Sequence, residues 1–199
     1  LPYVKEVFIQ DDTLPAGRAR QLSELILKSK LKIAWACYTR ADVDLTTLRL
    51  MKKAGCRCLH VGYESINGEI LKNIKKGTTP EGIKKFTEDT INAGINVQGD
   101  FVVGLPGETE ETIKETFGWV KGMGIEGYQF FNPQPQESTP LYAWLKKKGY
   151  LTKRGSLNYP KLSYNKMLYW RFKIMREIYL SPKYIINTMK NISSFADFY

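Results

Sequence analysis

Residues 99–109 read GDFVVGLPGET, and this stretch decides the fold that we expect. An apolar run ends in a glycine- and proline-rich loop, Gly104-Leu105-Pro106-Gly107, and a helical pattern opens at Glu108 and Thr109. The pattern predicts a strand, a tight loop and a helix. Glycines let a ligand approach the backbone, and amide groups at a helix start can face it. Gly-Pro-Gly also occurs in plain turns, so a ligand-binding loop and an ordinary turn both stay open.

The rest of the chain repeats this alternation of strand and helix. Strands are expected at residues 4–10, 31–38, 57–63, 95–103 and 128–131. Helices are expected at residues 15–30, 45–54, 68–74, 80–93, 108–123 and 141–147. Strands separated by helices pair in parallel through right-handed crossovers. The fold class is therefore α/β, and an open doubly wound sheet and an incomplete (β/α) barrel are the two alternatives.

Polar residues stand at the carboxyl ends of these strands, where both alternatives place functional groups. They are Asp11, Asp12, Arg40, Glu64, Ser65, the loop after Gly104, Asn132 and Gln134. Carboxylates can hold an ammonium group or a ribose diol, and an arginine can clamp a carboxylate. A small zwitterionic or sugar-bearing ligand suits this set better than a packed core does.

Composition indicates a globular, soluble protein. The chain has 199 residues, of which 43% are apolar and 25% are charged. It contains no apolar run of about 18 residues and opens with no signal peptide, so we expect a cytoplasmic protein. The first residues are Leu1-Pro2 and not methionine, which indicates a fragment or a processed product.

The three cysteines, Cys37, Cys56 and Cys58, are expected to be reduced and structural. Cys56 and Cys58 lie two residues apart on a predicted strand, so both side chains should point to one face. Their spacing matches no zinc or cluster pattern, and we predict no metal ligands in this chain. His60 lies in the middle of the same strand, where a packed core histidine is favoured over one that faces a cavity.

The net charge of +10 comes from the tail. Residues 1–142 are balanced, whereas residues 143–199 hold 12 basic and 2 acidic side chains. Basic and aromatic residues together can bind nucleic acid, but their dispersal favours a solvated helix face backed by aromatic packing. A long amphipathic helix is expected from Ser163 to Ser181, and a second helix at residues 184–192. Its apolar stripe is Met167, Trp170, Ile174 and Ile178.

Seven motifs in one order carry a family resemblance. They are IQDDTLP, WACYTRAD, MKKAGC, VGYESI, IKKGTT, FVVGLPGET and PQPQESTPLY. This order resembles the radical S-adenosylmethionine (SAM) superfamily. More narrowly, it resembles the branch of cobalamin-dependent enzymes and Mg-protoporphyrin IX monomethyl ester oxidative cyclase-like proteins.

The resemblance implies a partial, TIM-like (β/α) barrel. About five βα units would fill residues 1–150, and residues 151–199 would form a basic helical extension. SAM would lie across the carboxyl ends of the strands. Its amino group would meet Asp11 and Asp12, and its carboxylate or ribose would meet Arg40, Glu64 and Ser65. The residues that back its adenine would be Val102, Gly104, Leu105, Pro106 and Gly107.

Two departures from the family pattern matter. Glu108 falls one residue later than in the family's G-x-I-x-G-x-x-E, so a cofactor contact and a charge at a helix start are alternatives. The cluster-binding C-x-x-x-C-x-x-C is absent. The resemblance implies that these cysteines and the first strand precede Leu1, on a missing N-terminal part of the polypeptide, and that this chain is inactive alone.

In the complete protein, the resemblance implies a 4Fe-4S cluster, SAM and, in this branch, cobalamin. Reductive cleavage of SAM would give a 5′-deoxyadenosyl radical for methylation or oxidative cyclisation of a tetrapyrrole- or lipid-like small molecule. The alternatives are an RNA-modifying radical SAM enzyme similar to tRNA methylthiotransferases, and a non-catalytic binding barrel. The motifs assign no catalytic side chain.

Overall fold

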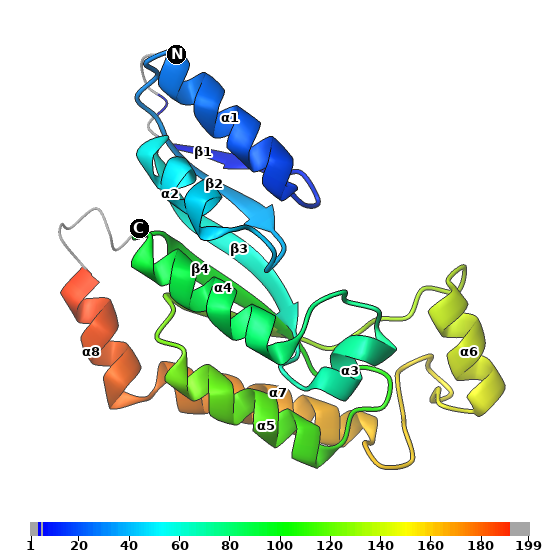
Figure 1. Cartoon of the computed structure of the whole chain (residues 1–199). Coiled ribbons are helices and arrows are strands. Elements are labelled where there is room, and N and C mark those ends of the chain that lie inside the picture. The colour runs from blue at the N-terminus through cyan, green and yellow to red at the C-terminus, as the bar shows by residue number, and fades with distance from the viewer. Residues whose placement is uncertain (1–3, 5, 192–199) are drawn as a thin grey trace.

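A computed structural model describes residue 4 and residues 6–191 (Figure 1). The strands are β1 (Glu6–Ile9), β2 (Ala34–Thr39), β3 (Cys56–Glu64), β4 (Asn96–Val102) and β5 (Gly127–Phe131). The helices are α1 (Ala16–Lys28), α2 (Leu45–Lys53), α3 (Gly68–Asn73), α4 (Pro80–Asn92), α5 (Glu110–Gly122), α6 (Pro140–Lys148), α7 (Tyr164–Tyr179) and α8 (Pro182–Asn191).

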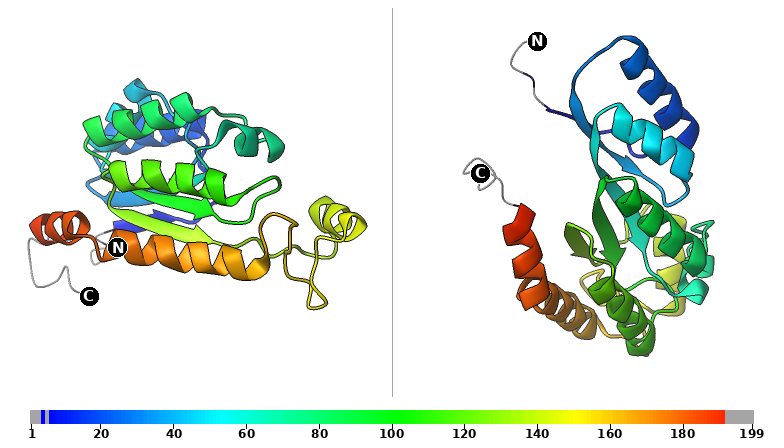
Figure 2. Two further views of the ribbon diagram at one scale, coloured as in Figure 1. Left: turned by 90° about the horizontal axis from the view of Figure 1, so that it is seen from below. Right: turned by 60° about the vertical axis from the view of Figure 1, so that its left-hand side comes forward.

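The five strands form one parallel sheet in the order β1-β2-β3-β4-β5. A doubly wound sheet reverses its strand order part-way, whereas this order follows the chain. Right-handed crossovers in this order place the connecting helices on one face. Figures 1 and 2 show α1, α2, α4 and α5 together on that face. The expected α/β fold of partial-barrel type is confirmed.

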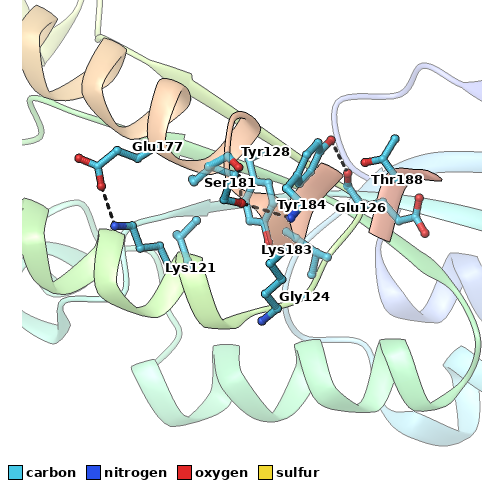
Figure 3. A pocket seen from close by; sticks show the side chains of 12 residues that line it. Lys121, Gly124, Glu126, Tyr128, Glu177, Ser181, Lys183, Tyr184 and Thr188 are labelled. Carbon is cyan, nitrogen blue, oxygen red and sulfur yellow. Dashed lines mark hydrogen bonds and ion pairs between the residues drawn. The ribbon is translucent and has the colours of Figure 1, made fainter. Parts of the chain in front are cut away.

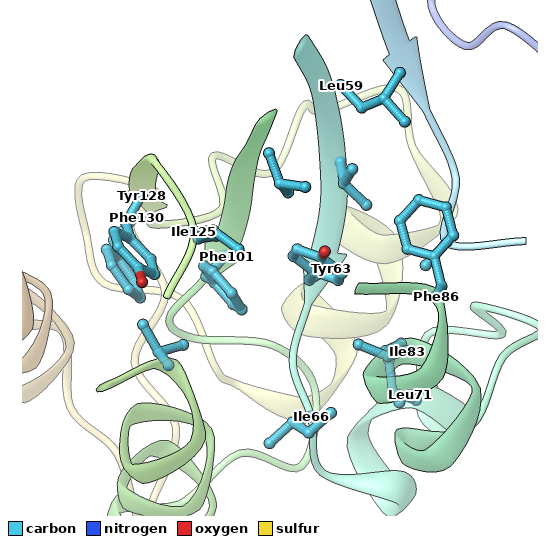
Figure 4. Packing of buried hydrophobic residues seen from close by; sticks show 14 of the residues in the cluster. Leu59, Tyr63, Ile66, Leu71, Ile83, Phe86, Phe101, Ile125, Tyr128 and Phe130 are labelled. Carbon is cyan, nitrogen blue, oxygen red and sulfur yellow. The ribbon is translucent and has the colours of Figure 1, made fainter. Parts of the chain in front are cut away.

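The core lies between the sheet and this layer of helices. Leu59, Val61 and Tyr63 of β3 are fully buried. Phe101 of β4 stacks between Tyr63 and Phe130, with ring centroids 5.5 and 5.2 Å apart (Figure 4). The alternate residues of β3 and β4 are half-buried and point to the opposite face of the sheet. That second face carries the polar side chains described below.

Short polar side chains fix the helix starts. Asp44 accepts a hydrogen bond from the Thr47 amide at the start of α2, and Thr79 accepts one from Gly82 before Pro80 opens α4. At α5, Thr109 and Thr112 exchange hydrogen bonds as a capping box. That cap makes Thr109 the residue before the helix, so α5 begins at Glu110 and not at Glu108 as expected.

The expectation that Cys56 and Cys58 share a face is wrong. The register with β2 shifts so that Cys56 pairs with Trp35 and Cys58 with Ala36, consecutive residues that point to opposite faces. Cys56 is buried, Arg57 is exposed, and Cys58 is half-buried. The extra residue of the bulge therefore turns the two thiols to opposite sides of the sheet.

Helix α7 packs along β5 and α5 (Figure 2). Its buried residues are Met167, Trp170, Ile174 and Ile178, which confirms the expected stripe. Helix α8 begins at Pro182, and Ile192, the last residue expected in this helix, lies outside the described residues. Buried side chains from Leu157 to Ile178 join the same core as the sheet. The boundary at residue 150 stays a prediction.

Tyr179 of α7 closes part of the outer edge of β5. Its hydroxyl accepts a hydrogen bond from the Tyr128 amide (3.1 Å) and donates one to the Tyr128 carbonyl (2.5 Å). Both backbone groups would otherwise face an unpaired sheet edge. No helix among the described residues is long and apolar enough to cross a membrane.

Replacing Tyr179 with phenylalanine should destabilise the fold. The change leaves the two backbone groups of Tyr128 without this partner, so we expect the free energy of unfolding to fall by about 1–3 kcal/mol. Urea denaturation measures the difference. Tyr169→Phe is the control, because this α7 tyrosine is 58% exposed. Equal stability of the two variants would contradict the role of the phenol.

Candidate functional site

The carboxyl ends of the parallel strands bring the expected site residues to one edge of the sheet. Asp11 and Asp12 follow β1, Arg40 follows β2, and Glu64 ends β3. The loop from Gly104 follows β4 by two residues, and Asn132 follows β5. Asn132 donates a hydrogen bond to the Val103 carbonyl, which ties the last two strand ends together. We call this edge the rim.

Glu64 has an unusual backbone at the centre of the rim. Its φ is +67°, a left-handed conformation that side chains rarely adopt, and the pairing of β3 with β4 shifts between Gly62 and Glu64. The carboxylate pairs with Lys76 (3.1 Å). A β-carbon on Gly62 would lie 3.1 Å from this carboxylate and 3.3 Å from the Lys76 amine. The absence of a side chain at Gly62 therefore makes room for the ion pair.

Asp100 is a rim residue that sequence reasoning missed. It pairs with Gly62 across the sheet and points to the face away from the helices. One carboxylate oxygen, Oδ1, is buried and has no hydrogen-bond partner. Burial, and then the negative charge of Glu64, raise the pKa of Asp100 to about 6, and Lys76 opposes the rise. A buried acceptor of this kind is suited to a donor group on a ligand.

A periodic signal could have identified Asp100. Polar Gln98 and Asp100 alternate with buried Val97, Gly99 and Phe101 along β4. This period of two separates the half-buried residues on the polar face of the sheet from the core residues. The expected contact Val102 continues the same half-buried row and pairs with Phe131 of β5.

Arg40 joins the rim through the segment between α3 and α4. Its guanidinium donates a hydrogen bond to the Lys76 carbonyl, and its Nε lies 3.5 Å from the Asp42 carboxylate. Lys76 thus connects Arg40 with Glu64. Asp11 and Asp12 are exposed at the neighbouring strand end, and the Asp12 amide donates to the Asp11 carboxylate.

The hydroxyl of Ser65 does not point to open space at the rim. Ser65 is fully buried, and its Oγ lies 3.1 Å from Thr116 Oγ1 of α5 and accepts a hydrogen bond from the Asn67 amide. These contacts hold the turn that follows Glu64 against α5. The expected cofactor contact of Ser65 has no test in the structure and stays a prediction.

Side chains from other parts of the chain hydrogen-bond to the backbone of the Gly104–Gly107 loop. The Glu108 carboxylate accepts hydrogen bonds from the Gly104 and Leu105 amides, and Tyr159 donates to the Gly104 carbonyl. Asn73 donates to the Pro106 carbonyl. Glu108 is 4% exposed, and burial raises its pKa to about 7, although the two amides oppose the rise. Its carboxylate thus braces the loop before α5 begins.

His60 belongs to the open face of the sheet. Its ring lies edge-on to Phe8 and Tyr38, with centroids 4.9 and 5.2 Å away, and the side chain is half-buried. Burial lowers the pKa of the imidazole. His60 is therefore packed among aromatic rings on the face of the sheet away from the helices, and whether it contacts a substrate stays a prediction.

The cysteines in this chain do not fit a 4Fe-4S cluster. Burial raises the pKa of Cys37 to about 12 and that of Cys58 to about 11, and it also raises the pKa of Cys56. Protonated thiols are poor ligands, because the thiolate is the form that binds metal. Across residue 4 and residues 6–191, no group of three His, Cys, Asp or Glu side chains could hold a metal ion.

A separate cavity of about 380 Å³ lies at the other end of β5, between α5, α7 and α8 (Figure 3). Lys121 and Glu177 form an ion pair at its wall, and Tyr184 donates a hydrogen bond to the Glu126 carbonyl. The cavity lies at the amino end of β5, whereas the rim lies at the carboxyl ends of the strands. It therefore lies apart from the site described here.

The strand order follows the chain, and polar groups lie at the carboxyl ends of the strands, which is the architecture of a barrel-type α/β protein. A profile of the Radical SAM superfamily matches residues 2–120. The chain belongs to this superfamily, which confirms the resemblance that the motif order indicated.

Curated relatives include methyltransferases. An uncharacterized methyltransferase of Pyrococcus horikoshii is 31% identical over 144 residues, which are 71% of this chain and 31% of that protein. Bacteriochlorophyllide d C-8(2)-methyltransferase of Chlorobaculum tepidum is 25% identical, over 93% of this chain and 46% of that protein. The chain thus spans less than half the length of these relatives.

Two further proteins extend this set. An anaerobic magnesium-protoporphyrin IX monomethyl ester cyclase of Rubrivivax gelatinosus is 31% identical over 63% of this chain and 24% of that protein. The radical SAM methyltransferase TsrM from Kitasatospora setae, solved with cobalamin and a [4Fe-4S] cluster, superposes with a TM-score of 0.66 at 20% identity. The superposition covers 72% of this chain and 30% of TsrM, and it supports the fold.

Glu108→Gln should change how stability depends on pH. The folded-state pKa of Glu108 is raised, so its contribution is present below the ordinary pKa and is lost as pH rises through about 7. The stability of the natural chain relative to the glutamine variant should therefore fall by about 1–3 kcal/mol between about pH 5 and pH 8. Urea denaturation at both pH values measures the change.

The matched control for this experiment is Glu81→Gln, which alters an exposed carboxylate in the first turn of α4. Its difference from the natural chain should not vary with pH in this way. A pH-independent difference for Glu108→Gln would show that the carboxylate is not desolvated under the loop.

Proposed function

We propose that this chain forms the SAM-binding rim of a radical SAM enzyme whose complete form methylates or oxidatively cyclises a small molecule. The observation that carries the proposal is the buried Oδ1 of Asp100, which has no hydrogen-bond partner. It belongs to the same rim as Lys76, which pairs with Glu64 and accepts a hydrogen bond from Arg40 through its carbonyl. Family membership supports the enzyme class. The printed activities of the methyltransferase and cyclase relatives support the two reaction types.

The residues have distinct tasks in this proposal. Asp11 and Asp12 offer carboxylates to the amino group of SAM, and Arg40 offers a cation to its carboxylate. Glu64 and Asp100 accept hydrogen bonds from the ribose hydroxyls, which would satisfy the buried Asp100 oxygen. The braced loop from Gly104 to Gly107 supports the adenine, with Val102 beside it.

SAM bound at a reduced 4Fe-4S cluster would supply a 5′-deoxyadenosyl radical, and that cluster needs cysteines outside these 199 residues. The chain's own part is to bind and orient SAM at the rim. Cobalamin belongs to the proposal as a cofactor of the complete protein, because TsrM, a structural neighbour, was solved with it.

The complete gene product, reconstituted anaerobically with iron and sulfide, should release 5′-deoxyadenosine from SAM when reduced with dithionite. Chromatography of the quenched reaction measures this product. Asp100→Asn should lower the yield at limiting SAM by about tenfold, whereas Asp89→Asn, which alters an α4 carboxylate paired with Lys85, should not. A protein that carries the cluster and yields no 5′-deoxyadenosine would refute the proposed activity.

Binding of S-adenosylhomocysteine to this chain should depend on the ionisation of Asp100. The pKa of Asp100 is raised to about 6, so acid protonates the acceptor and weakens binding. Calorimetric titration should show an affinity about tenfold lower at about pH 5 than at about pH 7.5. Asp100→Asn should remove most of this pH dependence, and a variant that keeps all of it would exclude Asp100 as the contact.

A further inference from the structure

A second cleft lies beside the rim, between the Gly104–Gly107 loop, helix α6 and the segment that follows α6. It comprises two cavities of about 880 and 280 Å³, which share Asn73, Pro106, Leu141 and Tyr159. The smaller cavity extends to Gly104 and Pro133 at the ends of β4 and β5. Volumes of this size are typical of small-molecule sites. We call it the loop–α6 cleft.

One part of the cleft lining is a ladder of aromatic rings. Trp144 of α6 meets Tyr150 edge-to-face at 5.7 Å between ring centroids, and Tyr150 meets Tyr159 in the same way at 5.5 Å. Trp144 is 39% exposed, although indole is among the most costly side chains to leave in water. A flat conjugated molecule could stack on these rings.

The charge of the cleft is positive. Three separate parts of the chain each contribute one lysine to the lining. Lys75 follows α3, Lys148 ends α6, and Lys161 lies in the segment before α7. Within the described part of the chain, none of the three forms an ion pair with a carboxylate. Glu108, the one carboxylate among the lining residues, is turned to the Gly104 and Leu105 amides. An anionic ligand would complement this set.

The ion pairs of the α7 lysines favour a small anion over a nucleic acid. On α7, Lys166 pairs with Glu110 and Lys173 pairs with Glu177, which also holds Lys121 of α5. A polyanion needs a continuous track of free cations, and these ion pairs interrupt one along α7. A lipid-like molecule offers no flat ring for the aromatic ladder.

We propose that the loop–α6 cleft binds a flat conjugated molecule that bears carboxylate groups, and that this cleft selects the substrate. The inference rests on the proposed function, because only that function makes the ligand of this cleft a substrate. The Gly104–Gly107 loop lines the cleft and also belongs to the rim. Stacking on Trp144 places the conjugated ring, and Lys148 and Lys161 pair with its carboxylates. The smaller cavity reaches Gly104 and Pro133, so the edge of the bound ring would lie next to the rim.

Protoporphyrin IX is a suitable probe, because it is flat and carries two carboxylates. Binding to this chain is followed by the probe's fluorescence, without SAM or a cluster, so the result does not depend on the activity at the rim. The natural chain should bind protoporphyrin IX at least about tenfold more tightly than its uncharged dimethyl ester. Equal binding of the two would overturn the charge requirement and with it the proposal.

Variants of the cleft locate the binding. Trp144→Ala and the double variant Lys148→Gln/Lys161→Gln should each weaken protoporphyrin IX binding by about tenfold. The matched controls are Tyr169→Ala, an exposed aromatic of α7, and Lys147→Gln, the neighbour of Lys148 on α6 that does not line the cleft. Both controls should change the affinity less than about twofold.

Circular dichroism confirms that each variant is folded, and Trp144→Phe, which keeps a ring, should retain most of the affinity. Loss of binding in the two controls to the same extent as in the cleft variants would indicate non-specific adsorption and would overturn the proposal. Unchanged binding in the cleft variants would do the same. If the chain binds the probe in the cleft while the complete protein cleaves no SAM, the cleft inference stands and the proposed activity fails.

Discussion

Parallel hydrogen bonding between strands taken in chain order is the constraint on which the rest of this structure depends. Each crossover must return over the same face, so the connecting helices cover one side of the sheet and leave the other free for Cys58, His60, Gln98 and Asp100. The same constraint brings the strand ends to one edge. Asp11 and Asp100 are separated by 89 positions in the chain, and both thereby lie near the carboxyl edge of the sheet.

Much of this arrangement could be predicted from local sequence. The Thr79-Pro80 start of α4, the apolar stripe of α7 and the strand-loop-helix at Gly104 all follow from short-range preferences of single residues. Strand ends were less accurate: β2 begins at Ala34 and not at Leu31, because residues 31–33 lie outside the register with β1. The bulge at Arg57 was hidden for the same reason, since register depends on a partner strand that local sequence does not reveal.

The site was harder to predict than the fold. Arg40, Glu64 and Gly104 lie where a strand changes into a loop, and the end of an apolar run in the sequence marks such positions. Asp100 stands inside a strand, and only the three-dimensional structure shows the nearby Glu64 and the carboxylate oxygen without a hydrogen-bond partner. Tyr159 and Asn73 reach the Gly104–Gly107 loop from 55 and 33 residues away. Contacts of that range depend on tertiary packing and leave no periodic signal.

The edge contact of Tyr179 has a consequence for how this sheet can grow. A phenol and a helix occupy the border of β5, so an additional strand is disfavoured there, whether it comes from this polypeptide or from a neighbouring molecule. In the described part of the chain, β1 pairs with β2 alone and offers its other border. The two edges of the sheet therefore differ: the β5 edge is partly covered, and a further strand would pair more easily with β1.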